Sequence, residues 1–106
     1  MNNSENKQNI CPICGSKTRY NARYENYICS DCVKLSTDID GKLLEFFNID
    51  MSGGYKANYK LTKEPYNSHI CYINKNKCYA TEARFGGIVV RLLEDVDDIN
   101  IYTQLQ

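Results

Sequence analysis

The feature that most constrains this chain is a pair of Cys-x-x-Cys units near its start. Cys11 and Cys14 form the first unit, Cys29 and Cys32 form the second, and 14 residues separate the two units. A two-residue gap lets both thiolates of a unit turn toward one point, so two units can supply the four sulfur ligands of a tetrahedral zinc site. The spacing therefore predicts one structural Zn²⁺ ion held by these four cysteines.

Six cysteines in 106 residues also allow two other interpretations. A secreted chain can use them as three disulfides, and a redox protein can use each Cys-x-x-Cys unit as a dithiol. A redox unit is expected beside a strand–helix pattern, which is not visible here. The first ten residues are polar and lack the apolar region of a secretory signal, and no apolar run is long enough to span a membrane. We therefore expect a cytoplasmic protein that binds zinc and does not associate with a membrane.

Residues 9–34 resemble the zinc-ribbon family through these cysteines. The resemblance implies that each cysteine pair lies on a turn and that a short hairpin joins the two turns. Residues 17–20 and 24–28 would form the strands of that hairpin. A treble clef, in which a helix begins at the second cysteine pair, is the alternative that the sequence leaves open.

The rest of the chain resembles short uncharacterised zinc-ribbon proteins of bacteria and phages. Two segments carry this resemblance, Ser-His-Ile-Cys-Tyr-Ile at 68–73 and Ala-Arg-Phe-Gly-Gly-Ile at 83–88. It implies a bacterial or phage origin and brings no activity with it.

Beyond residue 36 the sequence predicts an antiparallel sheet of about five strands. In residues 55–61, Tyr and Leu alternate with Lys and Asn, which is typical of a strand with one wet face. Turn residues such as Asp40-Gly41 and Gly86-Gly87 separate this strand from its neighbours. The other expected strands are 43–49, 66–73, 77–81 and 88–93, and only 81–85 indicates a helical turn.

These patterns predict a small β-rich fold in three parts. Residues 1–8 form a disordered N-terminus, residues 9–35 a four-cysteine zinc ribbon, and residues 36–106 a β-rich domain with an acidic tail. A chain this short builds a limited core, so a structural metal ion would add needed stability.

A second group of reactive residue types is His69, Cys71 and Cys78. If Asn74-Lys75 is a two-residue turn, the two cysteines face each other across a hairpin, and His69 shares their face. Such a group can hold a catalytic zinc with one open position, or act as a Cys–His pair in a small hydrolase, with Glu82 as a further candidate. Because a fourth ligand and an orienting partner are missing, we expect two buried cysteines and a hydrogen-bonded histidine instead.

A third group, Arg84 with Gly86 and Gly87, is a candidate site for a small phosphorylated ligand. A glycine pair can present backbone amides to an anion, and an arginine can bind it with two hydrogen bonds. The simpler interpretation, which we favour, is an Arg–Glu pair beside a tight turn.

Nucleic acid is the remaining class of partner. Residues 17–27 interleave three cations with three tyrosines, a pattern that can bind single strands: Lys17, Arg19, Arg23, Tyr20, Tyr24 and Tyr27. The whole chain is neutral, however, with 13 basic and 13 acidic residues. We therefore expect nucleic-acid binding to be weak or absent.

The sequence thus favours a zinc-stabilised interaction module without catalysis of its own, which binds a protein partner. The hydrolase and the binder of a small phosphorylated ligand are the alternatives.

Overall fold

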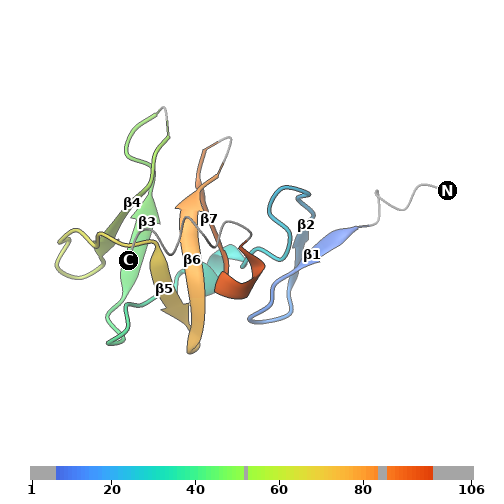
Figure 1. Ribbon diagram of the computed structural model, residues 1–106, viewed down its shortest axis with the longest axis horizontal. Helices are drawn as coiled ribbons and strands as arrows, with labels where there is room; N and C mark the ends of the chain where they lie inside the picture. The colour runs from blue at the N-terminus through green and yellow to red at the C-terminus, as the bar shows by residue number, and fades with distance from the viewer. Residues whose placement is uncertain (1–6, 52, 84–85, 97–106) are drawn as a thin grey trace.

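The computed structural model describes residues 7–51, 53–83 and 86–96. Its strands pair into three small antiparallel sheets, β1–β2, β3–β4 and β5–β6–β7. Figure 1 shows the three-stranded sheet in the middle, with β3–β4 on one side of it and β1–β2 on the other. The elements are β1 (Gln8–Ile10), β2 (Lys17–Arg19), α1 (Ser30–Val33), β3 (Leu44–Phe47), β4 (Lys56–Tyr59), β5 (Ile70–Ile73), β6 (Asn76–Glu82), β7 (Ile88–Leu92) and the 3-10 turn η2 (Leu93–Asp95). None of the described helices has the length and hydrophobicity that a membrane span requires.

All five strands predicted beyond residue 36 are present as β3 to β7, which confirms the small β-rich fold. The prediction that they form one sheet is wrong. Thr37 lies between the two sheets, because its backbone bridges Leu43 on one side and Tyr72 on the other. Its N–H donates to the Tyr72 carbonyl and its carbonyl accepts from the Tyr72 N–H, both at 2.9 Å. For one continuous sheet, a strand of the β3–β4 sheet would have to pair with the free edge of β5. Thr37 already occupies part of that edge.

The hairpin predicted between the cysteine pairs is also wrong in its pairing. β2 forms where it was expected, but its partner is β1, with Asn9 opposite Thr18. The segment 24–28 lies against β7 instead, since the Ile28 N–H donates to the Val90 carbonyl at 2.8 Å. The helical turn predicted at 81–85 is absent at Thr81 and Glu82, which belong to β6, and residues 84–85 lie outside the described residues.

A single helical turn follows the second cysteine pair. Cys29 is the N-cap of α1, Ser30 begins the turn, and Cys32 is buried within it. This is the feature that the treble-clef alternative predicts, although α1 has only 4 residues.

The β5–β6 hairpin has the predicted two-residue turn. Asn74 and Lys75 have φ angles of 49° and 69°, and a turn with two positive φ angles matches the right-handed twist of the strands it joins. The turn sets the register, so Cys71 lies opposite Cys78, as predicted.

One buried cluster connects the cysteine region with the sheets that follow it. Its members come from both sides of residue 35 and are Cys11, Ile28, Cys29, Cys32, Leu44, Cys71, Ile73, Cys78, Ala80 and Val90. The boundary predicted at residue 35 stays a prediction, as does disorder before residue 9, although Gln8 already lies in β1. The acidic tail from residue 97 onward lies outside the described residues.

Candidate metal centre and neighbouring sites

The two cysteine pairs are held by short-range backbone hydrogen bonds. After β1, the Cys11 N–H donates to the Ser16 carbonyl and the Gly15 N–H donates to the Cys11 carbonyl, both at 2.8 Å. Gly15 has a φ of 82°, which glycine adopts without a steric penalty and which closes this turn. The buried Asn9 side chain donates to the Tyr27 carbonyl at 2.8 Å. The hairpin is thereby attached to the segment that leads into the second pair.

The four sulfur atoms gather at one point. The Sγ atoms of Cys11, Cys14, Cys29 and Cys32 all lie within 4.8 Å of one another. The Sγ atoms of Cys14 and Cys29 are 3.7 Å apart. Four sulfurs at about 2.3 Å from a central zinc ion would be separated by about 3.8 Å, so the cluster has the size of a tetrahedral zinc site. The cluster can hold a metal ion, and zinc fits its donors and its dimensions.

Hydrogen bonds around the cluster favour thiolates at two positions. Burial acts against ionisation of Cys11, but the pKa of Cys11 is lowered because its sulfur accepts the Cys29 N–H at 3.4 Å. The pKa of Cys14 is lowered to about 6, mainly by the Ser16 hydroxyl, which lies 2.7 Å from its sulfur. Burial raises the pKa of Cys32, and neighbouring thiols act in the same direction. A divalent cation would favour ionisation of all four thiols.

His69 does not share a site with the two remaining cysteines. Its ring is stacked between two tyrosine rings, at centroid distances of 4.2 Å to Tyr55 and 5.1 Å to Tyr79. Its Nδ1 lies 2.6 Å from the Ala80 carbonyl and so is the protonated ring nitrogen when His69 is neutral. Among the described residues, the only group of three or more potential metal ligands is the four-cysteine cluster. His69 and the β5–β6 cysteines therefore do not come together as a second metal site.

Cys71 and Cys78 are both fully buried. The pKa of Cys71 is raised, first by the hydrogen bond with Cys78 and then by burial, which keeps this thiol protonated. The Cys78 sulfur donates to the Asn76 carbonyl at 3.3 Å. The same hydrogen bond with Cys71 lowers the pKa of Cys78. Both sulfurs are nevertheless enclosed in the sheet interior, where a substrate cannot reach them, and this burial favours the structural role.

The proposed phosphate site is partly described. The Gly87 N–H donates to Asn48 Oδ1 at 2.7 Å, and the Gly86 N–H donates to the Ala83 carbonyl at 3.1 Å. An anion at this turn would have to displace both acceptors. Arg84 lies outside the described residues, so the arginine of this hypothesis stays untested. Glu82 ends β6, and its carboxylate packs against Gly53.

The tyrosines near the metal centre contact cations of the chain itself. Lys7 lies over the Tyr20 ring at 4.9 Å, and Arg91 lies over the Tyr24 ring at 5.6 Å. The Tyr27 hydroxyl donates to the Arg19 carbonyl at 2.7 Å. One face of two of these rings is therefore already covered.

Three residues that organise these sites have weak sequence signals. From the sequence pattern, Asn48 is only a residue near the end of a predicted strand, and Tyr55 and Tyr79 are only members of predicted strands. The pattern gives none of the three a role in a site. Their side chains reach partners at least 10 residues away, which strand alternation does not identify. The single histidine between tyrosine-rich strands is the only hint of the ring stack.

No known protein family, curated protein or solved structure matches the chain. The geometry of the described residues is therefore the basis for any function assigned to it.

Proposed function

We propose that this chain is a zinc-stabilised interaction module whose zinc ion is bound by Cys11, Cys14, Cys29 and Cys32. The observation that carries the proposal is the convergence of four sulfurs within 4.8 Å. Four thiolates fill the coordination shell of zinc and leave no position for water or substrate, so the ion acts in folding rather than in catalysis. The four-cysteine zinc ribbon remains the family that this site resembles, and the single turn of α1 keeps the treble clef open.

The place of the cysteines in the core supports a structural role for the ion. Three of the four ligands are buried, and they belong to the same cluster as Leu44 and Val90. Zinc at this point would link the β1–β2 hairpin to α1 and to the sheet interior. Because the thiols must stay reduced to bind zinc, the proposal includes a cytoplasmic location for the chain.

A protein is the favoured partner of the module. Large apolar side chains are exposed at several points of the described surface, among them Ile39, Ile49 and Leu61 at 78%, 63% and 86%. Scattered apolar side chains are common on any protein, but a contiguous apolar patch is typical of a binding surface, and Leu61 lies with Leu43 at one groove. Two observations argue against a nucleic acid as the partner. The chain is neutral, which disfavours binding to phosphates, and cations of the chain already cover one face of two tyrosine rings that could stack on bases.

Metal analysis and unfolding together test the zinc assignment. Protein purified without chelator should contain about one equivalent of zinc, and Cys29→Ser should lose it. Cys78→Ser is the matched control, since it removes a buried thiol that is not one of the four metal ligands, and it should keep the ion. Thermal unfolding with and without chelator should show a lower Tm without zinc. A zinc-free protein with an unchanged Tm would exclude the structural role.

A further inference from the structure

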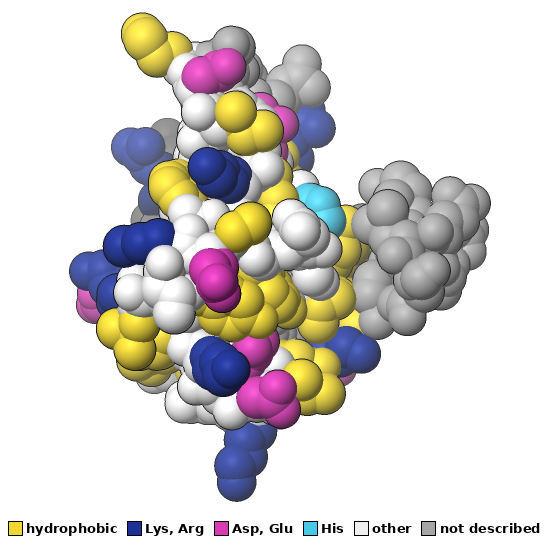
Figure 2. Space-filling model, turned by 90° about the vertical axis from the view of Figure 1, so that its left-hand side faces the viewer, with side chains coloured by type: hydrophobic (Ala, Val, Ile, Leu, Met, Phe, Trp, Pro, Cys, Tyr) yellow, Lys and Arg dark blue, Asp and Glu magenta, His cyan; other side chains and the backbone are white. Residues whose placement is uncertain are grey.

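A preformed groove lies at the end of the β3–β4 sheet where β3 begins and β4 ends. Its volume is about 680 Å³, and its walls are two turns, one before β3 that includes Lys42 and one after β4 that includes Glu64. Leu43, Tyr59 and Leu61 supply its apolar lining. Figure 2 views the molecule from its β3–β4 side and shows apolar side chains gathered there, with both signs of charge around them.

Side-chain contacts hold the floor of this groove in place. The Tyr59 hydroxyl donates to Asp38 Oδ2 at 2.9 Å, and the Tyr66 ring packs against the Tyr59 ring edge-on at 5.5 Å. Asp38 Oδ1 also accepts the backbone N–H groups of Asp40 and Lys42, each at 2.9 Å, which fixes the first wall. A groove that is already shaped loses little conformational entropy when it binds a partner.

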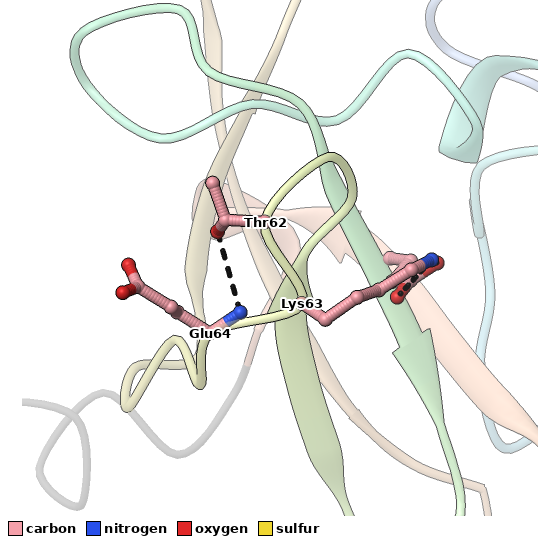
Figure 3. Close-up of polar contacts among 4 residues, drawn as sticks. Thr62, Lys63 and Glu64 are labelled. Atoms are coloured by element: carbon pink, nitrogen blue, oxygen red, sulfur yellow. Dashed lines mark hydrogen bonds and ion pairs between the residues drawn. The ribbon is translucent and has the colours of Figure 1, made fainter.

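The second wall, the turn after β4, is also held by contacts within the chain. Its two neighbouring charged residues, Lys63 and Glu64, have different surroundings. Lys63 forms an ion pair with Glu45 at 3.2 Å, and the Glu64 N–H donates to Thr62 Oγ1 at 3.3 Å. Figure 3 shows the Lys63 side chain extending toward Glu45 while the Glu64 side chain extends in the opposite direction. Within the described part of the chain, neither the carboxylate of Glu64 nor the ammonium of Lys42 forms an ion pair, and both residues are exposed.

The same surface carries a protrusion beside the hollow. Leu61 is 86% exposed and Leu43 is 38% exposed. The Lys60 N–H donates to the Leu43 carbonyl at 2.9 Å. Leu61 is the next residue after Lys60, so Leu61 and Leu43 lie close together and belong to one patch. Leaving such side chains in water is unfavourable, and their burial against another surface is the main driving force of association.

We propose that this groove is a self-association site, in which two copies of the chain pair about a two-fold axis. Leu61 of each copy enters the groove of the other, and Lys42 of each copy lies against Glu64 of the other. A two-fold interface requires a surface that is complementary to itself, so that residue i meets j and j meets i. A protruding leucine beside a hollow, with one cation and one anion on opposite walls, meets that requirement.

The size of the patch sets the strength of the dimer. A stable interface buries about 800 Å² per partner, and a patch with two exposed leucines is smaller. The dimer should therefore be weak and reversible, with a population that rises with protein concentration.

Analytical ultracentrifugation of the zinc-loaded full chain tests the proposal. Between about 5 µM and about 500 µM the weight-average mass should rise from that of the monomer toward that of the dimer. Leu61→Asp should keep the chain monomeric over this range. Met51→Asp is the matched control, because Met51 is fully exposed at the other end of the β3–β4 sheet, and it should leave the dimer unchanged. A monomeric wild type, or a dimer that survives Leu61→Asp, would overturn the proposal.

Charge exchange identifies the contact between the copies. Lys42→Glu and Glu64→Lys should each weaken the dimer by about fivefold or more, because each places like charges across the axis. A mixture of the two variants should form a 1:1 heterodimer, since both pairs are then of opposite sign, and the double variant should pair with itself. Failure of the mixture to associate would exclude this arrangement. Zinc content should be unchanged in all four proteins, so the result is independent of the metal assignment.

Discussion

The side-chain amide of Asn48 pairs with the backbone of Gly87 as a neighbouring strand would. Its Oδ1 accepts the Gly87 N–H at 2.7 Å, and its Nδ2 donates to the Gly87 carbonyl at 3.3 Å. The same Nδ2 donates to the Gly54 carbonyl at 2.7 Å. One side chain therefore connects the loop after β3 to the turn before β7. In the described part of the chain, no backbone ladder joins the β3–β4 sheet to the β5–β6–β7 sheet.

Asn48→Ala should lower the free energy of unfolding by about 1–3 kcal/mol, because it leaves backbone groups of two turns without their partner. Urea unfolding of the zinc-loaded protein measures this loss. Asn67→Ala is the control, since Asn67 is exposed, and its effect should be within about 0.5 kcal/mol of zero. Equal stability of the two variants would mean that water replaces Asn48 at no cost.

Asp38 should make the stability depend on pH. Its pKa is held below its ordinary value of 3.8, first by the Lys42 N–H and then by the Tyr59 hydroxyl, against the effect of burial. A group whose pKa is lower in the folded state stabilises the fold above its unfolded pKa, and this contribution disappears as the pH falls through the folded pKa. Asp38→Asn should therefore be less stable than wild type by about 1 kcal/mol at neutral pH, and the difference should shrink below about pH 4. Asp40→Asn, at an exposed position in the same turn, is the control for the loss of one carboxylate from this surface.

The sequence predicted the elements better than their partners. The strands β3 to β7 follow from alternation and turn residues, and the Cys71–Cys78 register follows from the two-residue turn Asn74-Lys75. These are local properties, because a hairpin turn fixes the pairing of the residues on both sides of it. The four-cysteine cluster was predictable for a different reason. Each Cys-x-x-Cys unit closes within one turn, and a tetrahedral metal site needs the two units together to supply four ligands.

The errors concern contacts between distant segments. Residues 24–28 have the composition of a strand, but their backbone pairs at one position with β7 and not with β2. Thr37 separates β3 from β5 by pairing with both Leu43 and Tyr72, although nothing in a polar turn marks it for that role. Such choices depend on which edge remains unpaired after the other strands have assembled, and local patterns of alternation and turn residues do not report it.

Nucleic-acid binding should be weak and sensitive to salt. Lys17, Arg19 and Arg23 are exposed and can contact phosphates. Three contacts give a log–log salt slope of only about −2 to −3, so affinity should fall well short of that of dedicated binders. Fluorescence anisotropy with a mixed-sequence single strand at physiological ionic strength measures it. Submicromolar binding that is lost in an Arg19→Ala, Arg23→Ala double variant would overturn the choice of a protein partner.

Thiol labelling should divide the six cysteines into two classes. In zinc-loaded native protein none should react quickly, because four are bound by the ion and Cys71 and Cys78 are fully buried. Chelation should release the four cluster thiols first, and the other two should follow only as fast as the sheet interior opens. A Cys71→Ala, Cys78→Ala double variant is the control, in which the fast phase should be unchanged and the slow phase should vanish. Rapid labelling of Cys71 or Cys78 with zinc still bound would show that a thiol of the β5–β6 hairpin is accessible. That result would favour the hydrolase hypothesis over a purely structural role for these two cysteines.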